Sequence, residues 1–304
     1  MNYPNNKILP MIDLEISGEC NLQCPTCWGT PHYMKQEYSL SKWLHLLKDL
    51  KELFGLTGVA LSGGEPLLVE GIDDFIIETK SSLELNVNLL TNTLNLPKYF
   101  SRIKPFLSTI SIPLDSSSEE NSRELRGEEC HRSALKWIAY LNNEHLDLPL
   151  KVGSVVSSLN IEDIPDIGEL LLGCGMQRRY PEKDVWKLYQ ATAFGAEQNN
   201  PLWQELRITE NVFKKAVQKT RKRYEGKINL TELATSETGG YCIIIRPNGS
   251  VVTNSKEDGR EYRLFENIFE DLDGAMEAIK KYHEVGRGVE RLKSSYFSQG
   301  LEKL

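Results

Sequence analysis

The feature that most constrains the fold is an alternation of short apolar runs with longer amphipathic stretches over the first 190 residues. The strand-like runs are Met11–Ser17, Gly58–Leu61, Glu84–Leu90, Thr109–Leu114, Leu150–Val156 and Val185–Tyr189. The helix-like stretches are Leu40–Phe54, Ile72–Ser81, Pro97–Phe106, His131–Asn143 and Ile161–Leu172. Strands that alternate with helices are joined by crossovers and lie parallel. The pattern therefore predicts an α/β fold.

The first helix-like stretch shows the stripe expected of a helix that packs on a sheet. Its apolar residues at helical spacing are Leu44, Leu47, Leu50 and Phe54. A chain of 304 residues, 40% of them hydrophobic, can form one sizeable core. Its apolar runs, such as Ile243–Ile245, are too short to cross a bilayer, and a formal charge of −7 argues against general nucleic-acid binding. We therefore expect no membrane and no nucleic-acid partner.

Three of the six cysteines lie within eight residues, directly after the first strand-like run. Cys20, Cys24 and Cys27 have the spacing C-x3-C-x2-C. Three thiolates at this spacing can hold three corners of a cubane iron–sulfur cluster, whereas a structural zinc site usually has four protein ligands. The missing fourth ligand leaves one iron open to a group that is not protein.

Two other roles for these cysteines are a disulfide framework and a zinc site. Six cysteines in 304 residues are sparse for a disulfide framework, and we expect no signal peptide. A zinc site completed by His32 or His131 stays open, although zinc sites usually come as two C-x2-C pairs and no second pair exists. A cluster needs reduced thiols, so we expect a cytoplasmic protein.

A second motif follows the second strand-like run, where the sequence reads Ser62-Gly63-Gly64-Glu65-Pro66. Glycines let the backbone approach a ligand closely, and the carbonyls and the Glu65 carboxylate can accept hydrogen bonds from an ammonium group. Alone this segment could be an ordinary turn. Its place one strand after the cysteines favours a binding role.

Together the two motifs resemble those of the radical S-adenosylmethionine (SAM) superfamily. In that family the three cysteines bind a 4Fe-4S cluster, whose open iron is chelated by the amino and carboxylate groups of SAM. The resemblance implies that Ser62–Glu65 contacts the methionine amino group and that Trp28 lies near the adenine. It covers at least residues 10 to 190.

The resemblance also implies a partial, TIM-like (β/α)6 barrel of parallel strands over residues 1–190. Residues 191–304 are then a C-terminal α+β extension that closes the barrel mouth. In barrels the chemistry lies where strands end and loops begin. Both motifs follow strand-like runs, which agrees with that rule.

Polar residues mark other strand ends. Asn92 suits the ribose hydroxyls of SAM, although it is equally a candidate turn cap. We include Ser154 and Tyr189 among the SAM contacts. Lys151 and Lys187 stand inside strand-like runs, where a charge is costly unless it faces a polar cavity. They are candidates for an anionic substrate, with a solvent-reaching edge position as the alternative.

The last third of the chain departs from the repeat. Residues 191–208 predict a loop and Glu210–Tyr224 a helix, whereas Tyr241–Arg246 and Ser250–Thr253 predict a hairpin. A final helix is expected near Gly274–His283.

The stretch Cys242–Val252 resembles part of the SPASM-type extension of some radical SAM enzymes, but the further cysteines that auxiliary clusters need are absent. Cys130, Cys174 and Cys242 are isolated, and we expect them to be buried or bystander thiols. We therefore predict one cluster. His131 is a candidate acid or base for which we expect an exposed helix start, so the catalytic group stays unassigned.

The resemblance implies that a reduced cluster cleaves SAM to a 5′-deoxyadenosyl radical, which abstracts hydrogen from the substrate. The implied electron donor is a reductase, a flavodoxin or a ferredoxin. We expect a small-molecule substrate, with a nucleotide or sugar as candidates. A maturase of peptides or proteins and a non-catalytic iron–sulfur or zinc protein are the alternatives.

A narrower resemblance is to viperin-type enzymes, which dehydrate nucleoside triphosphates. It rests on the stretches Ser111–Ser116, Leu150–Val155, Asn160–Asp163 and Trp186–Gln190. It implies that Lys151 and Lys187 meet phosphates and that Asn92 meets the SAM ribose. The chain departs from that pattern at Val185, where a basic residue is expected, and at Trp28-Gly29-Thr30, where the pattern has Phe-His-Thr. The terminal tryptophan of the pattern is also absent.

Overall fold

The computed structural model describes residues 11–29, 31–144, 147–176, 184–192, 203–238, 242–255 and 261–284. Its strands are β1 (Met11–Glu15), β2 (Gly58–Ser62), β3 (Asn86–Leu90), β4 (Thr109–Pro113), β5 (Leu150–Val156), β6 (Val185–Gln190), β7 (Leu230–Leu233), β8 (Ile244–Ile245), β9 (Val251–Asn254) and β10 (Glu261–Phe265). Its longer helices are α1 (Leu40–Phe54), α2 (Ile72–Ser81), α3 (Leu96–Ile103), α5 (Glu128–Asn143), α6 (Ile164–Gly173), α9 (Glu210–Tyr224) and α10 (Leu272–Glu284). Short helical turns are η1 (Pro66–Leu68), η2 (Lys104–Phe106), α4 (Glu119–Ser122), α8 (Trp203–Leu206) and η4 (Thr235–Glu237).

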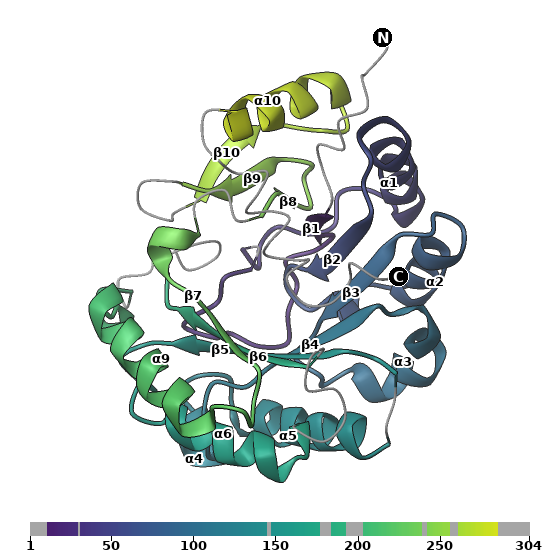
Figure 1. Ribbon diagram of the computed structural model, residues 1–304. Helices are drawn as coiled ribbons and strands as arrows, with labels where there is room; N and C mark the ends of the chain where they lie inside the picture. Colours follow the sequence, from purple (N-terminus) through teal and green to yellow (C-terminus); the bar gives the residue numbers. More distant parts are fainter. Residues whose placement is uncertain are drawn as a thin grey trace.

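The strands form one sheet in the order β10-β9-β8-β1-β2-β3-β4-β5-β6-β7. Strands β1 to β6 are neighbours in chain order and pair in parallel, which confirms the predicted α/β fold. The sheet curls around the middle of the molecule with the crossover helices outside it (Figure 1). Among the described residues, β10 and β7 share no hydrogen bonds, so the barrel is partial.

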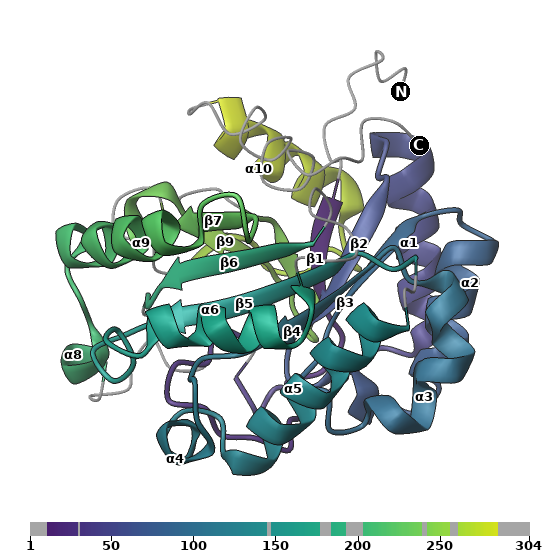
Figure 2. The ribbon, with the colours of Figure 1, turned by 60° about the horizontal axis from the view of Figure 1, so that its bottom comes forward.

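The helices cover the outer face of the sheet, as α5 and α6 do beside β4, β5 and β6 (Figure 2). Helix α1 shows why the local sequence folds this way. Ser39 caps its start by accepting a hydrogen bond from the Lys42 N–H, and Gly55 ends it with a left-handed φ of 73°. Its predicted stripe is confirmed, because Leu47, Leu50 and Phe54 are buried and Leu44 packs against the core.

The residues after 190 extend both edges of the sheet. Strand β7, absent from the sequence prediction, pairs in parallel with β6, and β8 pairs in parallel with β1. Strands β9 and β10 continue from β8 as antiparallel neighbours, of which β10 was also not predicted. Helix α8 interrupts the predicted loop 191–208, of which residues 193–202 lie outside the described chain. A domain boundary at residue 190 stays a prediction, while the strands on its two sides share one sheet.

Buried charges fasten the C-terminal strands to β1. Arg246, directly after β8, donates to the carboxylates of Glu15 on β1 and Glu261 on β10. The Arg246 side chain is 1% exposed. Over the ranges described above, no helix has the length and apolar character needed to span a membrane.

Candidate active site

A cavity of about 580 Å³ lies inside the partial barrel. All but one of the predicted site residues line it: Cys20, Cys24, Cys27, Trp28, Ser62, Gly63, Gly64, Glu65, Asn92, Lys151, Lys187 and Tyr189. The C-terminal extension contributes Trp203, Leu233 and Thr238 to the wall. The cavity wall therefore combines residues that lie between positions 13 and 238 of the chain.

The three clustered cysteines share this cavity wall, close enough for their charges to influence one another. Burial raises the pKa of each thiol, in the case of Cys27 to about 11. Each thiol therefore needs a metal or cation beside it to stay deprotonated at neutral pH.

The cysteine loop and the glycine motif pack as one unit through their backbones. The Gly64 and Glu65 N–H groups donate to the carbonyls of Ser17 and Glu19 at 2.9 and 2.8 Å. A Cβ atom on Gly64 would lie 2.1 Å from the Glu19 carbonyl oxygen, and one on Gly29 would lie 2.1 Å from that of Gly63. The glycines thus permit a close approach between two loops, in addition to any approach by a ligand.

Glu65 is 2% exposed and ties this unit to the end of β3. Its carboxylate accepts hydrogen bonds from the Thr91 hydroxyl and the Asn92 N–H, both at 2.7 Å, and from the Leu67 N–H at 3.1 Å. Burial raises the pKa of Glu65, while these three donors oppose the rise. The carboxylate therefore braces the loops and also faces the cavity.

Asn92 caps a turn, which is one of the two roles suggested by its sequence position, and it also contacts the cysteine loop. Its amide oxygen accepts a hydrogen bond from the Leu94 N–H at 3.1 Å, which is a turn cap. Its amide nitrogen donates to Asn21 Oδ1 at 2.7 Å, inside the cysteine loop. The cavity end of β3 is thereby held against the cysteines.

Ser154 does not line the cavity, and the structure does not support its place among the SAM contacts. Strand β5 alternates, so that Lys151, Gly153 and Val155 face the cavity and Ser154 faces the core behind it. The Ser154 hydroxyl donates to the Leu114 carbonyl and accepts from Trp186 Nε1. It joins three strands instead.

The wall made by β5 and β6 carries two lysines and a tyrosine. Lys187 lies opposite Gly153 in register, diagonal to Lys151, and both ammonium groups lie over the Tyr189 ring, 5.2 and 5.5 Å from its centre. Lys187 is 7% exposed. Burial, and then the charge of Lys151, lowers the pKa of Lys187 to about 7. Burial also raises the pKa of Tyr189, so its hydroxyl stays protonated.

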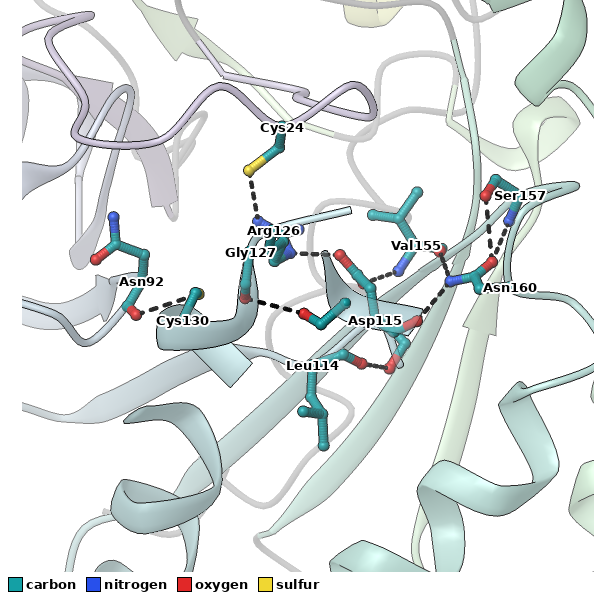
Figure 3. A network of polar contacts seen from close by, with 12 residues as sticks. Cys24, Asn92, Leu114, Asp115, Arg126, Gly127, Cys130, Val155, Ser157 and Asn160 are labelled. Atoms are coloured by element: carbon teal, nitrogen blue, oxygen red, sulfur yellow. Dashed lines mark hydrogen bonds and ion pairs between the residues drawn. The ribbon is translucent and has the colours of Figure 1, made fainter. Parts of the chain in front are cut away.

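Arg126, which the sequence interpretation missed, also lines the cavity. It lies between α4 and α5 and donates to the carboxylate of Asp115 and to Cys24 Sγ (Figure 3). Although burial opposes it, the charges of Asp115, Cys24 and Cys130 raise the pKa of Arg126 above its ordinary value. No local sequence signal marks this arginine, because its partners are distant in sequence.

The other candidate residues take structural positions. Cys130 and Cys242 are buried, as expected, and Cys174 is half-buried. His32 lines the cavity. The expectation of an exposed His131 is wrong, because His131 is 5% exposed in the first turn of α5.

The cysteine trio fits a cluster better than a single ion. In the described part of the chain, no group of three His, Cys, Asp or Glu residues is placed to hold one metal ion. A cubane cluster instead takes one thiolate per iron, so its ligands stand apart around a shared space. Cys20, Cys24 and Cys27 all line one cavity, where Arg126 donates to Cys24 Sγ.

Comparison with known proteins agrees with the fold and with the family that the two sequence motifs resemble. The family model of the radical SAM superfamily matches residues 14–171, just over half of the chain. A probable GTP 3′,8-cyclase of Methanocaldococcus jannaschii is 27% identical over 164 residues, which cover 53% of this chain and 55% of that protein. An S-adenosylmethionine-dependent nucleotide dehydratase of Lacinutrix mariniflava is 23% identical over 257 residues, which cover 81% of this chain and 51% of that protein.

Among solved structures, SuiB of Streptococcus suis bound to S-adenosylmethionine shares the fold with a TM-score of 0.65. It is 14% identical, and the match covers 91% of this chain and 67% of SuiB. The chain spans about half the length of the curated relatives it matches. The family match, the partial barrel and the cysteine loop at its mouth agree with the two sequence motifs: the chain belongs to the radical SAM superfamily, whose members use a 4Fe-4S cluster and SAM.

Proposed function

We propose that this radical SAM protein is an enzyme that abstracts hydrogen from a nucleotide whose phosphates bind Lys151 and Lys187. The observation that carries the proposal is the lysine pair on the cavity wall. Two neighbouring lysines inside a barrel disfavour each other's charge and lose hydration. Asp13 and Glu237 offset part of that cost at Lys187, and a bound polyanion would offset more. The dehydratase relative supports the substrate class, because its match runs over 81% of this chain.

The remaining residues divide between the cofactors and the substrate. Cys20, Cys24 and Cys27 would hold the cluster, and Ser62–Glu65 would contact the SAM amino group. Arg126 offers a cation on the same side of the cavity. When bound, the cluster and SAM would supply the one-electron reductive cleavage of SAM and, through it, the capacity to abstract hydrogen from the substrate.

The chain itself then has to position two ligands and exclude water. Trp28 would flank the adenine of SAM, Asn92 its ribose, and Tyr189 would lie between the two ligands. Lys151 and Lys187 would fix the phosphates and thereby the carbon that faces the radical. A flavodoxin, ferredoxin or reductase as electron donor and a cytoplasmic location remain predictions.

The test is anaerobic incubation of the reconstituted protein with dithionite, SAM and each nucleoside triphosphate. We expect one triphosphate to raise 5′-deoxyadenosine formation and to be converted to a new nucleotide. K151M and K187M should weaken that effect at least tenfold through a higher KM, because each removes a phosphate contact. K222M, at an exposed position on α9, is the matched control. Unchanged 5′-deoxyadenosine with every triphosphate would contradict the nucleotide substrate.

A peptide substrate is the second candidate. SuiB has also been solved bound to its precursor peptide SuiA, and SkfB of Bacillus subtilis, named as a maturation protein, is 25% identical over 167 residues. The incubation separates the two candidates. A peptide encoded beside the gene is added in the same assay. If this peptide raises 5′-deoxyadenosine formation and no nucleotide does, the maturase is favoured.

A further inference from the structure

A chain of polar contacts links Cys24 to the ends of β4 and β5 (Figure 3). Arg126 Nη1 donates to Cys24 Sγ at 3.8 Å, and Arg126 Nε donates to Asp115 Oδ2. The Val155 N–H donates to Asp115 Oδ1 at 2.7 Å. The Asn160 amide donates to the carbonyls of Asp115 and Val155, both at 2.8 Å. The guanidinium is therefore held in one place from two strands.

The position of this guanidinium matters because Cys24 is one of the three cysteines proposed to hold the cluster. The side chain of Arg126 is 19% exposed and that of Asp115 is 1% exposed, so solvent screens the cation poorly. Adding an electron makes a cluster more negative, and a hydrogen-bond donor or cation at a ligating sulfur stabilises that reduced form. A cation at Cys24 would thus make the cluster easier to reduce.

Asp115 adds a second effect to this arrangement. Its carboxylate fixes the guanidinium and at the same time cancels part of its charge. The potential at the sulfur then depends on the pair: the arginine raises the reduction potential, and the aspartate limits the rise.

We propose that Arg126 and Asp115 are positioning residues that set the reduction potential of the cluster by placing a partly neutralised guanidinium against the sulfur of Cys24. The proposal depends on cluster binding by the three cysteines and is independent of the nucleotide substrate. It concerns the protein without SAM, so a contact between Arg126 and SAM is not required.

The test is a redox titration of the reconstituted protein in the absence of SAM and substrate. Electron paramagnetic resonance measures the amount of reduced cluster at each potential. We expect R126Q to lower the ratio of reduced to oxidised cluster about tenfold at a fixed potential, which corresponds to about 59 mV for one electron. D115N removes the neutralising charge and keeps one acceptor oxygen, which can accept from Arg126 Nε or from the Val155 N–H but not from both. We therefore expect D115N to shift the potential in the opposite direction, upward.

Two further variants make the result decisive. R132Q removes an exposed arginine of α5 and should leave the potential unchanged. R126K keeps a cation, so the reduction potential of its cluster should lie between those of the native protein and R126Q. If iron and sulfide analysis shows that R126Q assembles too little cluster, R126K replaces it in the comparison. Shifts of R126 and D115 variants in the same direction, or shifts no larger than that of R132Q, would overturn the proposal.

Discussion

Lys187 shows how one buried charge couples folding to pH. Its pKa is lowered from 10.5 to about 7, first by burial and then by Lys151. Between these values the unfolded chain holds a proton that the folded protein has lost. Stability therefore falls as the pH is lowered from about 10.5 to about 7 and falls no further below that.

The K187M variant should therefore be more stable than the native protein, with the larger gain in Tm at pH 6.5 than at pH 9.5. Thermal unfolding of the cluster-free protein at the two pH values measures this difference. K222M changes an exposed lysine of α9 and should show no such dependence. A gain for K187M that is equal at both pH values would contradict a lowered lysine pKa.

Gly64 tests the close contact between the two sequence motifs. An alanine Cβ would lie 2.1 Å from a backbone oxygen that cannot swing away, so one loop must move. We expect G64A to lose most of its cluster on reconstitution, measured as iron and sulfide per chain. G173A is the control, because nothing lies within 4 Å of the added methyl at the end of α6. Full cluster content in G64A would show that the loops have room to separate.

The site residues were predictable where their chemistry is local. The cysteines and the glycine pair are contiguous motifs, and the structure brings both to one cavity. The expected SAM contact of Ser154 did not take the alternation of side chains along a strand into account. Because Lys151 faces the cavity, residue 154 lies on the opposite face of β5. Arg126 could not be found, because its approach to Cys24 depends on a tertiary contact over 102 positions.

At the scale of elements, the parallel strands β1 to β6 were predictable because each buries at least one face: β1, β2 and β6 are buried almost throughout, and β3, β4 and β5 alternate buried with half-buried residues. Their apolar runs are long and their helices amphipathic, so sequence and packing agree. Strands β7 and β10 were missed because their residues are mostly half-buried or exposed, as in Leu230–Leu233. Such strands form because they pair with an existing sheet edge, and their own hydrophobic pattern contributes less.

The Arg246 cluster is the element-scale feature with the clearest energetic consequence. Arg246 is buried between Glu15 on β1 and Glu261 on β10. R246M would leave two carboxylates without their cation, and breaking one partner of such a pair costs about 3–5 kcal/mol. We expect a loss of that order in the free energy of unfolding by urea.

The double variant E15Q/R246M should recover part of that loss, because one of the uncompensated charges is gone. R263M is a control on the same edge strand, since Arg263 pairs with Glu266 at the surface and should contribute about 0–1 kcal/mol. Equal losses in R246M and R263M would mean that burial does not strengthen this pair.

At the scale of the whole molecule, the C-terminal strands extend the sheet of β1 to β6 at both of its edges. Strand β7 pairs with β6 at one edge, and β8, β9 and β10 continue the sheet from β1 at the other. The cavity takes Cys24 from the beginning of the chain, Lys187 from the middle and Thr238 from the last third. A C-terminal extension of this kind is part of the site and of the core. It follows that the barrel and the extension should not unfold independently.

We expect the cluster-free protein to unfold in urea in one transition, with coincident midpoints by tryptophan fluorescence and far-ultraviolet circular dichroism. A chain that stops after Thr192 would lose β7 and β8, which leaves the outer edges of β6 and β1 unpaired. Exposed, unpaired strand edges favour aggregation, and the buried Glu15 would also lose Arg246. That fragment should therefore show no cooperative transition. Two separate transitions in the full chain, or a cooperative fragment, would instead establish the barrel as an independent domain ending near residue 190.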